Sequence, residues 1–371
     1  MRPEVAQAMS EASRHCVDMA ELQAAASKII AQTTGAEAGY VASGASACLL
    51  LATAACMTGL DPGRMARLPD AMGMKDEVIM VRSQRNFYDH AVRAAGACII
   101  EVGLPDRYAG AGVRDAEAWE IDDAITERTA AVFYVADTQA RPPLSEVVRV
   151  AHARGVPVIV DAAAQLPPQL NLRRFIAGGA DLVAFSGGKA LGGPQASGFL
   201  CGRRDLIMAV ALQHLDHDVF WDLWEPPPFL IDKQRLKGLP PHGIGRSCKA
   251  GKEEIMGLLA ALRIFTGEGD AVRHGRWLKA AEEVAKGCVG IAGIDVDIHD
   301  AENSAGVPLI VLSLGRARHD ATLVILALQN GNPSIHVDPS QREQNKILIN
   351  PMCLKDGEPG IIAAALRKAL V

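Results

Sequence analysis

The sequence has few aromatic residues, scattered cysteines and no concentration of basic charge. Phe, Trp and Tyr make up 4% of the 371 residues, and the formal net charge is −5. Binding to nucleic-acid phosphates needs clustered Lys and Arg, and no such cluster is visible, so we expect no nucleic-acid partner. The eight cysteines form no CxxC pair. We therefore expect neither a zinc site nor a disulfide scaffold, and we predict a reducing, cytoplasmic location.

Two stretches of the sequence bear on whether the chain is exported or spans a membrane. The first 22 residues are polar and lack the apolar core of a signal peptide. Residues 38–60 carry no charge over 23 positions, which is long enough to span a bilayer. They contain three glycines and several hydroxyl side chains, and no basic flank follows the membrane orientation pattern. We interpret this stretch as a helix buried inside the protein and expect no membrane partner.

Short apolar runs alternate with helical patterns through the middle of the chain. This alternation predicts an α/β fold with a mostly parallel sheet, covered by helices on both faces. Ligands of such sheets bind beyond the carboxyl ends of the strands. The expected strands are Glu77–Arg82, Ala97–Val102, Thr129–Ala136, Val156–Asp161, Asp181–Phe185 and Ser197–Gly202, with helices at Tyr88–Ala95, Glu117–Glu127 and Ser145–Arg154.

The alternation breaks near residues 218–245, which are rich in Pro, Gly and Trp. A strong helical pattern follows over Lys252–Phe265, and weaker α+β character after it. We therefore predict a large domain at 35–245 and a smaller C-terminal α+β domain at 246–371. Residues 1–34 look helical, and we expect them to pack with the small domain.

Three groups of residues stand at predicted strand ends or helix starts. Ser43-Gly44-Ala45-Ser46 precedes the uncharged helix, and N–H groups at a helix start with a hydroxyl beside them suit a phosphate. Asp161 closes the strand VPVIVD and has no cation within ten residues on its C-terminal side. Lys189 lies in the glycine-rich loop SGGKALGG. Each has an ordinary interpretation when taken alone: a helix cap, a turn aspartate and a lysine that extends into solvent.

Taken together, the three groups match the needs of one cofactor. Pyridoxal 5′-phosphate requires oriented donors for its phosphate, an acid partner for its ring nitrogen and an amine for its aldehyde. The glycines around Lys189 do not form a P-loop, which needs GxxxxGK[ST], and no GxGxxG follows the first strand. The constellation therefore favours pyridoxal 5′-phosphate over a nucleotide.

The chain resembles fold-type I pyridoxal-phosphate enzymes of the selenocysteine synthase-like group, which includes D-glucosaminate-6-phosphate ammonia-lyase. The matching stretches follow the family's order and cover residues 39 to about 262, and the rest of the chain matches loosely. DAAAQLPP and SGGKALGGPQ are the most specific of them. The other stretches are GYVASGASACLLLATAACMTGLDP, RNFYDHAVRAAGACIIEVG and GIGRSCKAGKEEIMGLLAAL.

The resemblance implies a role for individual residues. Lys189 takes the position that binds the cofactor's aldehyde as a Schiff base, and Asp161 the position that pairs with the pyridine nitrogen. Gln84 stands where related enzymes often stack a histidine on the ring; glutamine stacks less well, and Tyr88 is an alternative. The other implied cofactor contacts are a phosphate ligand at Ser186, the phosphate-binding turn at Gly44, Ala45 and Ser46, and a ring-face contact at Ala163.

Two further features are open to more than one interpretation. Arg246, in GIGRSCK, could bind an anionic substrate group through its fork of donors, or it could brace the domain junction. The motif HLDHD at residues 214–218 contains side chains of the types that bind metals, but its spacing is not a recognised site. We favour a solvated loop there and expect no metal.

The resemblance implies a lyase that acts on an amino-acid-like substrate, with α,β-elimination and ammonia release as the leading reaction. Racemisation and aldol cleavage share the same carbanion, so they remain alternatives, as does a selenocysteine synthase-like transferase working on aminoacyl-tRNA. A non-catalytic protein that keeps the fold without cofactor is a further alternative. The implied fold has a mostly parallel, seven-stranded type of sheet, and the implied assembly is a homodimer or a higher even-numbered oligomer.

Overall fold

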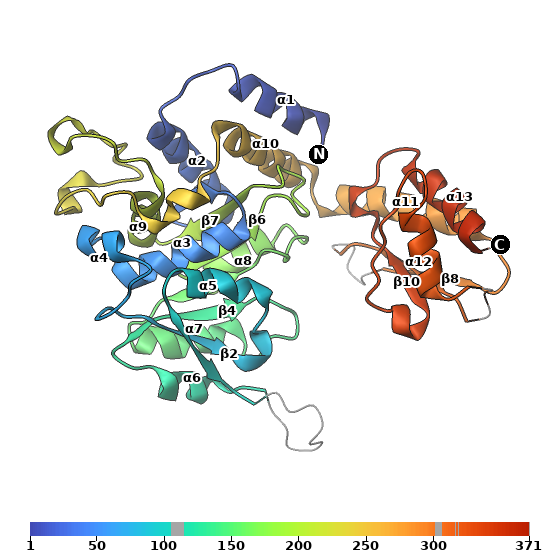
Figure 1. The fold of residues 1–371 in the computed structure, drawn as a ribbon, viewed down its shortest axis with the longest axis horizontal. Helices are drawn as coiled ribbons and strands as arrows, with labels where there is room; N and C mark the ends of the chain where they lie inside the picture. Colours follow the sequence, from blue (N-terminus) through green and yellow to red (C-terminus); the bar gives the residue numbers. More distant parts are fainter. Residues whose placement is uncertain (105–114, 301–305, 316, 318, 371) are drawn as a thin grey trace. The chain divides into compact units, whose positions relative to one another are not determined.

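The computed structural model describes residues 1–104, 115–300, 306–315, 317 and 319–370. The chain divides into two compact units, one of residues 1–166 with 170–264 and one of 167–169 with 265–371 (Figure 1). The division therefore falls at 264/265, whereas the sequence pattern placed it near 245. Helix α10 (Lys252–Glu268) is the reason, because most of its length packs within the first unit.

The first unit contains a seven-stranded sheet in the order β1-β7-β6-β5-β4-β2-β3. Strands β2 to β6 run parallel to one another, while β7 lies antiparallel to both β6 and β1. The predicted mostly parallel sheet is confirmed. Its strands are β1 (Ala38–Ala42), β2 (Glu77–Val81), β3 (Cys98–Val102), β4 (Thr129–Val135), β5 (Val158–Asp161), β6 (Leu182–Ser186) and β7 (Gly198–Gly202).

Helices cover both faces of this sheet. Val158, Ile159 and Val160 follow one another on β5 and are all fully buried, although successive side chains point to opposite faces. The long helix α3 (Ala45–Thr58) packs across β1 and β4 to β7, while α7 (Leu144–Ala153) packs on β4 and β5. The other helices of this unit are α1 (Pro3–Ala12), α2 (Met19–Thr34), α4 (Pro62–Arg67), α5 (His90–Ala94), α6 (Ala118–Ala124), α8 (Asn171–Ala177) and α9 (Arg204–His214).

The uncharged stretch 38–60 is a strand followed by a helix, so the predicted buried helix is confirmed for residues 45–58 and wrong for residues 38–42, which form β1. Residues Gly39-Tyr40-Val41 pair with β7, and the chain turns at Gly44, whose φ of 132° disfavours any residue with a Cβ. Among the described residues, no helix is both long and apolar enough to cross a membrane.

The N-terminal segment belongs to the first unit, not to the small one. Helix α2 lies along the outer edge of β1, where Gln23 donates to Val41 O at 2.8 Å and accepts from Val41 N at 3.1 Å. Ser27 accepts from Gly39 N at 2.9 Å. These side chains satisfy backbone groups that an edge strand would otherwise leave unpaired, which explains why the segment packs here.

The second unit has a three-stranded antiparallel sheet in the order β10-β9-β8. Its apolar core is shared with three helices. This matches the smaller α+β C-terminal region that the sequence predicted. The strands are β8 (Asp295–His299), β9 (Leu309–Ser313) and β10 (Lys346–Ile349), and the helices are α11 (Asp270–Cys288), α12 (Ala321–Gln329) and α13 (Glu358–Leu370).

Candidate active site

A pocket of about 490 Å³ opens at the carboxyl ends of the parallel strands in the first unit. Residues that follow β2, β4, β5 and β6 line it, together with the start of α3. This is the edge of the sheet where α/β folds bind ligands. Seven of the predicted site residues lie in its wall: Gly44, Ala45, Ser46, Asp161, Ala163, Ser186 and Lys189.

The turn between β1 and α3 presents an open helix N-terminus to the pocket. The first helical hydrogen bond runs from Cys48 N to Gly44 O at 3.0 Å, so the N–H groups of Ala45 and Ser46 lie ahead of it. No side chain caps this end of α3, and its first turn carries no acidic residue. The local dipole is therefore free to attract an anion, and the Ser46 hydroxyl lies beside it.

Strand β7 reaches this turn only because its first residue is glycine. Gly198 pairs with Ser186 at the end of β6. A Cβ at position 198 would lie 2.6 Å from Ala45 N and 2.6 Å from Gly44 C. The glycine thus brings Ser186 and the start of α3 to the same wall of the pocket.

Asp161 ends β5 as a buried carboxylate, 8% exposed. Its Oδ1 accepts from Ala163 N at 3.0 Å, and no other donor within the described ranges bonds to its side chain. Burial raises the pKa of Asp161 above its ordinary value, while the Ala163 N–H and the charge of Lys189 act in the opposite direction. A cationic partner in the pocket would relieve this cost of desolvation.

Lys189 stands on a short loop that backbone hydrogen bonds hold in shape. Gly187 N donates to Ser197 O, Gly193 N to Gly187 O and Gly192 N to Lys189 O, each at 2.9 Å. The Lys189 side chain lies in the pocket wall and is exposed. No described residue pairs with its Nζ, so the amine is available to a ligand.

Gln84 is not part of the pocket wall. Its amide oxygen accepts from Val135 N at 2.9 Å and its amide nitrogen donates to Arg141 O at 3.2 Å. Both polar atoms of the side chain therefore already have backbone partners. Tyr88, the alternative for the ring contact, does line the pocket.

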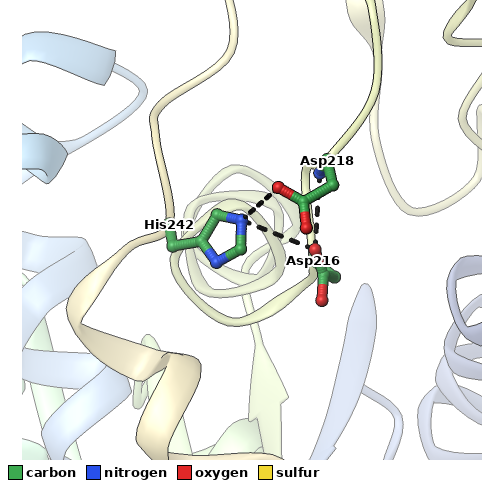
Figure 2. A group of neighbouring side chains, drawn as sticks. All are labelled: Asp216, Asp218 and His242. Atoms are coloured by element: carbon green, nitrogen blue, oxygen red, sulfur yellow. Dashed lines mark hydrogen bonds and ion pairs between the residues drawn. The ribbon is translucent and has the colours of Figure 1, made fainter.

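Arg246 also lies outside the pocket wall. It belongs to the 3₁₀ turn η5 (Ile244–Cys248), and its guanidinium donates to Asp216 at 2.8 Å. Asp216 and Asp218 in turn face His242, whose Nε2 lies 3.5 Å and 3.0 Å from their carboxylates (Figure 2). We call Asp216, Asp218, His242 and Arg246 the surface cluster.

The two histidines of HLDHD are not members of that cluster. His214 and His217 are buried, and each bonds to a backbone oxygen, of Cys248 and Leu212 respectively, at 3.1 Å. The motif therefore splits into exposed acids and buried histidines, a separation that sequence spacing did not reveal.

Several polar residues of the pocket were not foreseen. Each lies in a loop that follows a strand of the parallel sheet or in the loop that carries Lys189. This position at the ligand edge of the sheet was the signal in the sequence that could have found them. These residues are Asn86, Asp137, Gln165 and Gln195.

The profile of one protein family, described as SelA, L-seryl-tRNA selenium transferase, matches residues 5–220. The chain belongs to the SelA family. Since the match covers more than half of the chain and includes the whole pocket wall, the predicted resemblance is confirmed.

Two relatives align along nearly the whole chain. A 5′-C-glycyluridine monooxygenase-decarboxylase from a Streptomyces species is 31% identical over 96% of this chain and 83% of its own length. D-glucosaminate-6-phosphate ammonia lyase from Salmonella typhimurium is 31% identical over 99% of this chain and 90% of its own length.

Solved structures agree with the family assignment. A structure of D-glucosaminate-6-phosphate ammonia-lyase has a TM-score of 0.80 at 30% identity, and the alignment covers 100% of this chain and 91% of that one. A variant of serine palmitoyltransferase from S. paucimobilis, solved with a bound PLP–myriocin aldimine, shares the fold, with a TM-score of 0.54 at 13% identity, covering 100% of this chain and 84% of that one. The predicted fold-type I architecture is therefore confirmed.

Proposed function

We propose that this SelA-family protein is a pyridoxal 5′-phosphate-dependent lyase that releases ammonia from an amino-acid-like substrate by α,β-elimination. The observation that carries the proposal is that one pocket gathers an unpaired lysine, a buried carboxylate and an open helix N-terminus. The ammonia lyase aligned over 99% of this chain supports the choice of reaction.

The residues present fit the cofactor chemically. Asp161 is a buried acid with no cationic hydrogen-bond partner in the described part of the chain, which suits a protonated ring nitrogen. The N–H groups of Ala45 and Ser46, with the hydroxyls of Ser46 and Ser186, suit a phosphate. Ala163 and Tyr88 offer surfaces to the ring, and Lys189 supplies the amine.

Two side chains would do most of the proton chemistry. When bound, pyridoxal phosphate withdraws electrons from the substrate's α-carbon and makes its proton easier to remove. Asp161 would keep a proton on the ring nitrogen, which strengthens this effect. Lys189 Nζ would hold the cofactor's aldehyde and, with substrate bound, would serve as the general base for the α-proton. The start of α3 would hold the phosphate and so fix the orientation in which Lys189 acts.

A second reaction is favoured by one specific relative. The monooxygenase-decarboxylase matches this chain as closely as the ammonia lyase does. Oxidative decarboxylation consumes oxygen and releases carbon dioxide, whereas elimination does neither. Measuring oxygen uptake together with ammonia release separates the two. A gel shift with tRNA at physiological salt tests the transferase alternative, which the net charge of −5 disfavours.

We also propose a cytoplasmic homodimer, or a higher even-numbered oligomer, that acts on a small molecule and binds no nucleic acid. Large apolar side chains on the first unit support the assembly. Phe87, Phe220 and Leu223 are each at least 79% exposed.

The decisive test is covalent trapping of the cofactor. Protein incubated with pyridoxal phosphate should absorb at about 410–430 nm, and borohydride should then add about 206–231 Da to the chain, at Lys189 by peptide mapping. Lys189→Ala should abolish the adduct, while Lys252→Ala, whose amine pairs with Glu253, should keep it. An adduct at another lysine would overturn the site. A screen of amino acids and amino-sugar acids for ammonia then tests the reaction.

A further inference from the structure

A buried chain of hydrogen bonds runs from the HLDHD motif to the turn that begins α3. His214, at the end of α9, lies between Tyr40 of β1 and Cys248 of η5. Its Nδ1 is 2.9 Å from Tyr40 Oη, and its Nε2 is 3.1 Å from Cys248 O. The same Cys248 carbonyl accepts from Ser43 N at 3.1 Å. Ser43 directly precedes the Gly44-Ala45-Ser46 turn.

The geometry fixes the role of each ring nitrogen. A backbone carbonyl only accepts, so Nε2 carries the proton and donates to Cys248 O. Nδ1 therefore accepts from the Tyr40 hydroxyl. Burial lowers the pKa of His214 to about 4, so the ring is neutral at physiological pH. Tyr40 and His214 are 0% and 3% exposed, and their rings meet edge to face at 5.1 Å. The pair is rigid and protected from water.

The surface cluster holds the other side of the same segment. Arg246 of η5 donates to Asp216 at 2.8 Å, and Asp216 lies two residues after His214. His242 reaches both Asp216 and Asp218 (Figure 2). Residues 214–218 thus hold η5 at two points, one buried through Cys248 and one exposed through Arg246.

We propose that His214 is a positioning residue for the cofactor phosphate, acting through the Cys248 carbonyl on Ser43 and the turn at the start of α3. This inference depends on the proposed function. It accounts for the HLDHD motif and for Arg246 without a metal and without a direct contact to substrate. Loss of the His214 hydrogen bond frees the carbonyl that holds Ser43, so the N–H groups that face the phosphate lose their fixed direction.

The test compares pyridoxal phosphate with pyridoxal, which lacks the phosphate. Apoprotein is titrated with each compound, and the dissociation constants are read from the absorbance change. His214→Leu should weaken binding of pyridoxal phosphate roughly tenfold and leave pyridoxal within about twofold. Tyr40→Phe should act in the same direction more weakly. His214→Gln, whose amide can still donate to Cys248 O, should stay within about threefold of the wild type for both compounds.

His217 provides the matched control. It lies in the same motif, is buried and, among the described residues, hydrogen-bonds only to Leu212 O, so His217→Leu should lower the melting temperature without changing the ratio of the two dissociation constants. If His214→Leu also keeps the wild-type ratio, the positioning role is wrong and the residue only stabilises the fold. If wild-type protein binds both compounds equally, the inference fails as well. If it binds neither, the proposed function fails instead.

Discussion

At the scale of single residues, two buried aspartates illustrate opposite uses of the same side chain. Asp181, just before β6, accepts from Val158 N and His152 at 2.8 Å and from Arg203 at 3.1 Å. Asp161, at the end of β5, accepts only from Ala163 N among the described residues. The Asp181 carboxylate has three partners within the protein, whereas that of Asp161 has one among the described residues.

Replacing each aspartate by asparagine should therefore give different results. Asp161→Asn removes an unpaired buried charge, so the apoprotein should be as stable as the wild type or more stable, while the cofactor-loaded protein loses most ammonia release. Asp181→Asn breaks a charged network and should cost about 2–3 kcal/mol of unfolding free energy, with cofactor binding kept. Urea unfolding of both apoproteins measures these changes in unfolding free energy. A large loss of stability in Asp161→Asn apoprotein would show that its charge is already paired.

The pH dependence follows from the same carboxylate. Because burial raises the pKa of Asp161 in the fold, the folded state binds the proton more tightly than the unfolded state. Its stabilising contribution is present at pH values below the unfolded pKa and is lost as the pH rises through the folded pKa. In Asp161→Asn, the part of the pH dependence of unfolding free energy that comes from this carboxyl group should disappear.

At the scale of elements, the site depends on how closely β7 approaches the start of α3. Gly198→Ala places a Cβ at 2.6 Å from Ala45 N and 2.9 Å from Phe185 O, and neither backbone atom can yield without moving its element. We expect a loss of about 1–3 kcal/mol in stability and weaker binding of pyridoxal phosphate. Gly275→Ala in α11, where nothing lies within 4 Å, is the control and should be neutral or stabilising by up to about 1 kcal/mol. Thermal unfolding measures the stability of both variants, and titration with pyridoxal phosphate measures their cofactor binding. Equal results for Gly198→Ala and Gly275→Ala would contradict the close approach of β7 to the start of α3.

At the scale of the whole molecule, the exposed apolar side chains of the first unit should be covered by a second copy. An obligate interface of this type buries more than about 2,000 Å². Phe220→Glu combined with Leu223→Glu should shift the light-scattering mass from dimer to monomer and reduce ammonia release. Val272→Glu in α11 replaces a side chain that is 65% exposed and should leave the dimer intact. Active wild-type monomer at the assay concentration would disprove the assembly.

The sequence by itself determined the central strands and was enough to predict that Asp161 and Lys189 lie at the pocket. Strands β2 to β6 are local apolar runs, and a side chain at the end of such a run lies at the ligand edge of a parallel sheet. No distant contact was needed for that inference. Strand β1 was missed because its composition resembles the helix that follows, and only pairing with β7, more than 150 residues later, defines it.

Only the tertiary structure shows the contacts of Gln84, Arg246 and His214. Each of these side chains has partners that are distant in sequence: Gln84 bonds to Val135 51 residues away, and His214 to Tyr40 174 residues away. Local patterns report which face of an element is apolar, but a hydrogen bond between distant segments depends on how the elements pack. The sequence could therefore name candidate groups for the site, while only the fold shows which side chains contact one another.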